Sequence, residues 1–256
     1  MFGATYFTYD GVFSGVYGLT LADFNDSSVV ETTAFSPVLL ATKPTAANRF
    51  FHNGVVYDSA PQFSFSVISE TEINDICRRE ILSWLVGRNE YKRLELHHDG
   101  IENYYYNCVF TDTQIIFVHG RCHGFRLTAN FDSPYAYGRP TQVIVPSGSH
   151  TVIIENKSDI KDDYVYPVVK FTGGGVDIVN ETDDPDRHFK FADLNPLDVV
   201  TVDNEVKHIS ATLGGEKLSN FTSKKWLRLL GGRNTLRIES MGEVTITCPN
   251  YMMIGF

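Results

Sequence analysis

The sequence predicts a mainly β protein of two domains with a single α-helix. Aromatic residues make up 13% of the 256 residues and stand beside many Val, Ile and Thr, the residue types that pack well in pleated sheets. Dipeptides suited to tight hairpin turns punctuate the first half of the chain. Only one segment carries apolar residues at helical spacing. Because single cores rarely grow beyond about 250–300 residues, we expect two domains of ordinary size.

The first half shows the signals of half-buried antiparallel strands. Apolar and polar residues alternate over Phe63 to Val67 and over Phe125 to Phe131. Asp10-Gly11, Asn53-Gly54 and Asp99-Gly100 are the dipeptides that favour two-residue hairpin turns.

One segment predicts a helix from about Glu70 to Val86. Ser69 and Glu72 have the spacing of a capping box, and Gly87 follows the last apolar position. The stripe expected to pack on a sheet consists of Ile73, Ile76, Cys77, Ile81, Trp84 and Leu85.

Pro and Gly concentrate in Ser133 to Pro140 and again in Pro146 to Ser149, which is typical of an inter-domain connection. We therefore predict domains at 1–138 and 139–256. The second should be a β-sandwich or jelly roll, because only short strand signals follow the boundary. These signals lie at Thr151 to Ile154, Tyr166 to Phe171, Val199 to Val202, Leu227 to Leu230, Thr235 to Glu239 and Val244 to Cys248.

The formal charge of −9 disfavours specific nucleic-acid binding, which requires a positive field. Met1 to Tyr6 lacks the basic and apolar regions of a signal peptide, and no apolar run is long enough to span a membrane. We expect neither secretion nor membrane insertion. Cys77, Cys108, Cys122 and Cys248 show no regular spacing and are expected to be free thiols in a reducing cytoplasm.

No pattern in the chain indicates catalysis, a metal site or a cofactor. The densest reactive set is His97, His98, His119, Cys122 and His123, but strand alternation splits it between two faces. The acidic loop 183–186 lacks the ligand pattern of an EF-hand and is expected to be a solvated turn. The glycine runs at 173–175 and 231–232 lack the residues of a phosphate loop and predict turns. Trp226 either stacks on a sugar or fills the core, and we favour the core.

Fragments along nearly the whole chain resemble, in order and spacing, the distal tail protein family of long, flexible-tailed bacteriophages. In the first half they are Phe7-Thr8-Tyr9-Asp10-Gly11, Ser14, Gly18, Trp84-Leu85-Val86-Gly87, Tyr91-Lys92-Arg93-Leu94, Tyr104-Tyr105-Tyr106, Gly124-Phe125-Arg126-Leu127 and Ser133-Pro134-Tyr135-Ala136-Tyr137. In the second half they are Asn156, Tyr166-Pro167, Val202-Asp203, Lys225-Trp226-Leu227-Arg228-Leu229 and Gly232-Arg233-Asn234-Thr235-Leu236.

The resemblance implies a tail-tube-like first domain and a galectin-like second domain. It further implies a homohexameric ring at the virion tail tip, made in the bacterial host cytoplasm. The ring would join the tail tube protein to a tail-associated protein and to receptor-binding proteins, and DNA would pass through it. We add the hypothesis that an acidic inner wall repels the passing genome.

The candidate contact between subunits is a long hairpin around Asn53-Gly54. It comprises Phe50, Phe51, Asn53, Gly54, Val55, Val56 and Tyr57. The alternative function is a carbohydrate-binding or carbohydrate-cleaving module, although the sugar-contacting motif of galectins is not found in the sequence.

Overall fold

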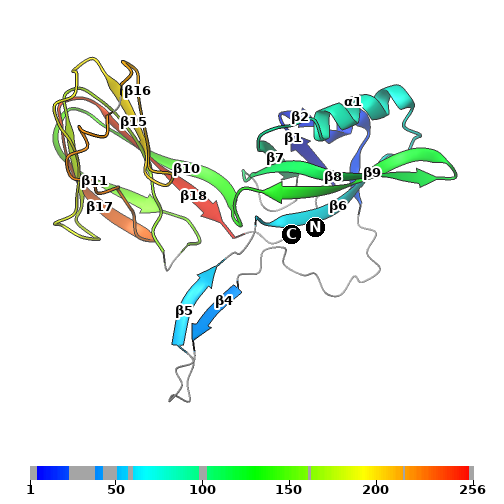
Figure 1. Cartoon of the computed structure of the whole chain (residues 1–256), viewed down its shortest axis with the longest axis horizontal. Helices are drawn as coiled ribbons and strands as arrows, with labels where there is room; N and C mark the ends of the chain where they lie inside the picture. Colours follow the sequence, from blue (N-terminus) through cyan, green and yellow to red (C-terminus); the bar gives the residue numbers. More distant parts are fainter. Residues whose placement is uncertain are drawn as a thin grey trace. The chain divides into compact units, whose positions relative to one another are not determined.

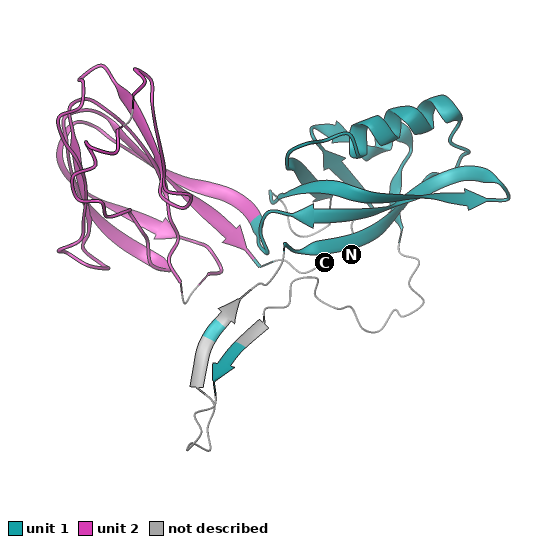
Figure 2. Ribbon diagram, viewed as in Figure 1, with its two compact units in different colours: residues 1–136, 253–256 teal, residues 137–252 magenta. Residues whose placement is uncertain are grey.

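The computed structural model describes residues 5–22, 38–42, 51–56, 60–97, 103–160, 163–215 and 217–253. The chain divides into two compact units (Figure 2): residues 1–136 with 253–256, and residues 137–252. The division after residue 136 lies close to the boundary that we placed after residue 138. In the described part of the chain, no helix has the length and apolar character needed to cross a membrane.

Unit 1 is built on an antiparallel sheet in the order β2-β1-β7-β8-β9-β6-β3 (Figure 1). The strands are β1 (Tyr6–Tyr9), β2 (Val12–Phe13), β3 (Thr20–Ala22), β6 (Gln62–Ile68), β7 (Lys92–His97), β8 (Tyr106–Val118) and β9 (Arg121–Phe131). A short 3-10 helix, η1 (Ser14–Tyr17), follows β2. The backbone N–H of Leu21 in β3 donates to the carbonyl of Thr5 just before β1 at 2.9 Å, so the sheet curls back toward its first strands.

The predicted turn at Asp10-Gly11 is confirmed. Both residues have positive φ, 50° and 77°, and the flanking Tyr9 and Val12 stand opposite each other in β1 and β2. The alternation predicted for Phe125 to Phe131 is also confirmed, because every second side chain from Phe125 is buried in β9. Asp99-Gly100 lies outside the described residues.

Helix α1 (Asp75–Leu85) covers the core of unit 1 with Ile81, Trp84 and Leu85. The Trp84 ring stacks on Phe7 with a centroid distance of 5.8 Å and an interplanar angle of 3°. Its indole N–H donates to the Tyr9 carbonyl at 2.9 Å. The helix is therefore fixed to β1 both by ring packing and by a buried hydrogen bond.

The helix starts five residues later than the capping box predicted, which corrects the expected beginning near Glu70. The Asn74 side chain caps it by accepting from the Cys77 N–H at 2.9 Å. The Ser69 hydroxyl instead accepts from Thr71 N–H two residues on, a local turn that competes with a helix cap. Ile76, which we placed in the packed stripe, is 75% exposed.

Unit 2 is a sandwich of two antiparallel sheets (Figure 1). One sheet has the order β10 (Ala136–Val145), β18 (Val244–Met252), β12 (Val168–Thr172), β15 (Val199–Asp203) and β16 (His208–Ala211). The other has the order β11 (Gly148–Asn156), β17 (Gly232–Ser240), β13 (Val176–Asn180) and β14 (His188–Phe191). Alternate residues of both sheets, including Phe171, Ile178, Phe189, Leu236 and Ile246, fill the core between them.

The stretch 133–140, where we placed the domain boundary, contains the division between the two units, but it also holds the start of strand β10, with Pro140 inside that strand. The stretch 146–149 holds the start of β11. Since β10 is an edge strand, a missing N–H is tolerated there. The segment Leu227 to Leu230 is not a regular strand and shares only an isolated bridge between Val165 and Leu229. Strands β13, β14 and β16 were not foreseen.

Candidate interaction surfaces

Residues 51–56 of the candidate hairpin form one strand, so the turn predicted at Asn53-Gly54 is wrong. Strand β4 (Val38–Thr42) pairs with β5 (Phe51–Val56), with Val38 opposite Val56 and Thr42 opposite Phe51. The connection therefore lies between residues 42 and 51, and Asn53-Gly54 is inside a strand.

Asn53 and Gly54 form a β-bulge in β5. Leu39 stands opposite Val55 and Ala41 opposite His52, so the two residues between them face the single Leu40. Gly54 has φ 101°, a conformation that glycine adopts at little cost. Phe50 and Tyr57 lie outside the described residues, as do the side chains of Phe51, Asn53, Val55 and Val56.

A second surface is the free edge of β8, which we define as residues 109–118. In the described chain, β7 pairs with β8 only at Tyr106, Asn107 and Cys108, while β9 accompanies β8 to Val118. The backbone groups of the free edge that point away from β9 therefore have no strand partner among the described residues. An open strand edge of this length is a template for another strand.

The free edge ends in exposed apolar side chains. Phe117 is 56% exposed and Val118 is 45% exposed. They precede a turn at His119-Gly120, where both residues have positive φ. The glycine at the second position of this turn was the available sequence signal. The signal is weak, because histidine is not one of the residues that usually precede glycine in such turns.

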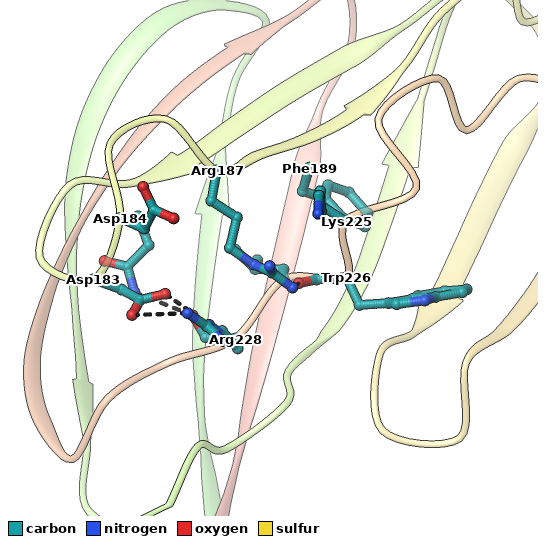
Figure 3. Close-up of a pocket in the computed structure, with 9 residues that line it drawn as sticks. Asp183, Asp184, Arg187, Phe189, Lys225, Trp226 and Arg228 are labelled. Atoms are coloured by element: carbon teal, nitrogen blue, oxygen red, sulfur yellow. Dashed lines mark hydrogen bonds and ion pairs between the residues drawn. The ribbon is translucent and has the colours of Figure 1, made fainter.

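A shallow pocket opens in unit 2 near the predicted acidic loop (Figure 3). The Arg228 guanidinium pairs with the Asp183 carboxylate through Nε–Oδ2 at 2.8 Å and lies 3.9 Å from the centre of the Tyr164 ring. The Tyr164 hydroxyl donates to Asp183 Oδ1 at 3.2 Å. Hydrogen bonding to Asp183 raises the pKa of Arg228. Asp183 is thus a partner in a half-buried ion pair, whereas Pro185 and Asp186 of the predicted turn are exposed.

The pocket has about 200 Å³ of empty space, open solvent included. The part enclosed by protein holds about one water molecule. Trp226 lines the pocket and is half-buried, so it does not fill the core as we predicted. The centroid of its ring lies 4.9 Å from that of Phe221. Figure 3 shows the indole directed away from the Asp183–Arg228 pair. The pocket does not enclose a space the size of a sugar ring.

A network of buried asparagines fixes the segment beside this pocket. Asn180 donates to Asn234 Oδ1 at 2.9 Å and to the Arg228 carbonyl at 3.1 Å. Asn234 binds both the N–H and the carbonyl of Leu230, at 2.9 and 2.8 Å. These side-chain hydrogen bonds take the place of the backbone hydrogen bonds that a regular strand would have made with a neighbouring strand. Sequence reasoning missed this role, although amides at otherwise apolar core positions were the available signal.

His98 of the predicted reactive set lies outside the described residues, and the described histidines of that set make separate contacts. His97 Nε2 lies 2.8 Å from the Thr8 hydroxyl, and His123 Nδ1 lies 3.3 Å from the Ser69 carbonyl. Within the described residues, no three His, Cys, Asp or Glu side chains are placed to share a metal ion. All four cysteines are free, and burial raises the pKa of Cys248 to about 11, which makes its thiol a poor nucleophile.

Comparison with known proteins covers both units. A family described as phage tail protein N-terminal domain matches residues 2–133, and one described as phage tail C-terminal domain matches residues 135–248. No curated protein sequence matches. Among solved structures, the fold is similar to that of SPP1 Dit (gp 19.1), which is described as a paradigm of the hub adsorption apparatus in phages infecting Gram-positive bacteria. The TM-score is 0.67 at 14% identity, over 96% of this chain and 98% of that chain.

Two structures of the phage p2 baseplate in its activated conformation are also similar. The structure with Sr gives a TM-score of 0.57 at 9% identity, over 98% of this chain and 100% of that chain. The structure with Ca gives 0.53 at 8% identity, over 93% and 92%. The chain belongs to a family of phage tail proteins, a structural rather than an enzymatic family whose place is the virion tail.

Proposed function

We propose that the protein is a hub at the tail tip, where six copies form a ring that joins the tail tube to tail-associated and receptor-binding proteins. The observation that carries the proposal is the end-to-end likeness of both units to a protein described as a hub, together with tail-family matches in each unit.

The surfaces of unit 1 suit a head-to-tail ring. In such a ring each copy contacts its two neighbours through two different faces. The ring closes when the rotations between successive copies add up to a full turn. The free edge of β8 offers unpaired backbone groups on one side of the unit. The β4–β5 hairpin offers a second element, since its described strands pair only with each other. A neighbouring copy that covers the β8 edge removes an aggregation hazard.

Unit 2 would decorate the ring. Its two-sheet sandwich is the architecture expected of a galectin-like domain, and it holds a half-buried ion pair and a network of buried asparagines. The absence of a sugar-sized hollow at the Trp226 pocket gives the carbohydrate alternative no structural support there.

The experiment is native mass spectrometry with negative-stain imaging of the purified chain. The wild type should give a hexamer that images as a ring. Phe117→Lys with Val118→Lys should reduce the ring to smaller species, because charge at the end of the free edge opposes burial of that edge. Both side chains are already exposed, so the fold should survive.

The matched control is Ile76→Lys, which charges an apolar side chain of α1 that is 75% exposed. This variant should keep the ring. A monomeric wild type would refute the proposal. An intact ring in the Phe117/Val118 variant would exclude the end of the β8 edge from the contact between subunits.

A further inference from the structure

Arg187 lines the pocket of unit 2 with a guanidinium that is held in place but not fully paired. Its Nη2 donates to the Trp226 carbonyl at 3.2 Å, which fixes the head group against the segment that follows Lys225. Its Nε is buried and has no hydrogen-bond partner among the described residues. Figure 3 shows the head group on the Trp226 side of the Asp183–Arg228 pair. Because buried donors are nearly always paired, an open one that faces a pocket indicates an acceptor from outside the chain.

The charges that line this pocket do not balance. Asp183 is taken up by Arg228 at 2.8 Å, so this pair adds no net charge. Asp184 accepts a backbone N–H two residues further along the chain at 3.0 Å. In the part of the chain that the structure describes, Asp184, Arg187 and Lys225 form no ion pair. Three cations against two carboxylates leave one positive charge at the pocket, in a chain whose formal charge is −9.

The size of the pocket restricts the group that can enter it. The enclosed part holds about one water molecule, so the ligand enters only with a small polar tip. An ionised carboxylate carries one charge and two acceptor oxygens in a plane, which match the Nε–H and a neighbouring N–H of an arginine. At the rim, the half-buried indole of Trp226 offers the kind of aromatic surface that is enriched in protein interfaces.

We propose that this pocket binds a carboxylate on an acidic segment of another tail protein. Arg187 holds the carboxylate through its free Nε–H, Lys225 supplies the second cation, and Trp226 packs against the apolar part of the segment. Charge complementarity carries the choice of partner, because a single carboxylate neutralises the one positive charge of the pocket. The inference rests on the proposed place of the protein in the tail tip, and it adds to that function a docking site on unit 2.

The chemistry of the pocket is tested on the purified full-length chain with poly-L-glutamate as the probe. The readout is the fluorescence of Trp226, since Trp84 is buried in the core of unit 1 and contributes a constant background. Physiological salt screens the repulsion from the rest of the acidic chain. We expect saturable binding, and inorganic polyphosphate should bind more weakly because a phosphate group is larger than the enclosed space.

Arg187→Lys is the decisive variant, because it keeps the charge and removes the Nε–H donor. It should weaken the binding of poly-L-glutamate by about tenfold or more, as expected for the loss of a hydrogen bond to a charged group. The control is Arg139→Lys, the same change at an exposed residue of β10 in the other sheet, and it should bind like the wild type. Near-ultraviolet circular dichroism checks that both variants keep the fold. Tight binding by Arg187→Lys, stronger binding of polyphosphate, or no binding by the wild type would overturn the inference.

The partner is tested by carbodiimide cross-linking of intact tails, since this reagent joins an amine to a carboxylate only where the two are in contact. Peptide mass spectrometry should find Lys225 joined to a Glu or Asp of another tail protein, and Arg187→Lys should reduce this product while Arg139→Lys leaves it unchanged. A Lys225 that joins only to its own chain or to another copy of it would overturn the proposed partner.

These results are separable from those for the proposed function. If the purified chain forms no ring and yet binds poly-L-glutamate through Arg187, the hub function fails and the carboxylate site stands without its tail partner. If a ring forms and Arg187→Lys binds the probe like the wild type, only the docking site is overturned.

Discussion

At the scale of single residues, Asp198 is the most completely enclosed carboxylate among the described residues, and it fixes its own loop to the connection that follows β16. Its Oδ1 accepts from the Leu213 N–H and the Thr212 hydroxyl, both at 3.0 Å, and its Oδ2 lies 2.9 Å from Lys217 Nζ. The Leu213 N–H, with help from Lys217, lowers the pKa of Asp198 from 3.8 to about 2. The charged form is therefore the form that the fold prefers.

This preference predicts a pH dependence of stability. A carboxyl whose pKa is lower in the folded state stabilises the fold above its unfolded pKa, and this contribution disappears as the pH falls toward the folded value. We expect the wild type to lose stability between about pH 4 and pH 2. Asp198→Asn should be less stable at neutral pH and should show a shallower decline in that window.

Urea denaturation at a series of pH values measures the effect. Asp193→Asn is the matched control, because Asp193 lies in the same loop and is exposed. It should follow the wild type throughout. Parallel pH curves for wild type and Asp198→Asn would show that the loop anchor does not depend on the charge.

At the scale of elements, the sequence was informative wherever one local rule decided the outcome. Asp10-Gly11 makes a hairpin turn, as the dipeptide predicts, with positive φ at both residues. Asn53-Gly54 satisfies the same rule, yet a bulge also requires positive φ, so the dipeptide alone does not distinguish turn from bulge. The helix start failed for a similar reason: the hydroxyl of Ser69 serves a local turn as readily as a cap.

The candidate surfaces were less accessible to sequence reasoning because they depend on pairing between distant segments. No local pattern in β8 reveals that β7 accompanies it for three residues only. Likewise, Leu227 to Leu230 alternates like a strand, but Asn180 and Asn234 hold its backbone instead. Which strand edge stays open is decided by tertiary contacts, and no single segment encodes it.

The β4–β5 hairpin yields a prediction at this scale. Replacing Phe50, Phe51, Val55 and Val56 by Ser should dissociate the ring, because the proposed contact with the next copy would lose four apolar side chains. Burial of apolar side chains is a main source of interface stability. Native mass spectrometry gives the result directly.

A matched control removes the same number of exposed apolar side chains from unit 2, replacing Leu197, Val206, Leu213 and Met241 by Ser. That variant should remain a hexamer. A ring that persists in the hairpin variant would exclude the hairpin from the subunit contact while leaving the β8 edge as the remaining candidate.

At the scale of the whole molecule, the candidate contacts between subunits and the buried networks fall in different units. The β8 edge and the hairpin belong to unit 1, whereas the Asp198 anchor, the asparagine network and the Arg228 pair belong to unit 2. Both sheets of unit 2 are complete within its own residues, apart from Ala136 at the start of β10. Its stability should therefore not depend on ring formation.

A fragment of residues 137–252 should accordingly fold alone and remain monomeric. We expect cooperative unfolding in urea with a free energy within about 5–15 kcal/mol, the range of independent domains. Near-ultraviolet circular dichroism should show its buried aromatic residues in fixed positions, and native mass spectrometry should show a single copy. A fragment that lacks fixed aromatic signals would mean that unit 1 completes the fold of unit 2. A fragment that assembles into a ring would instead move the subunit contact to unit 2, because the β8 edge and the hairpin are absent from it.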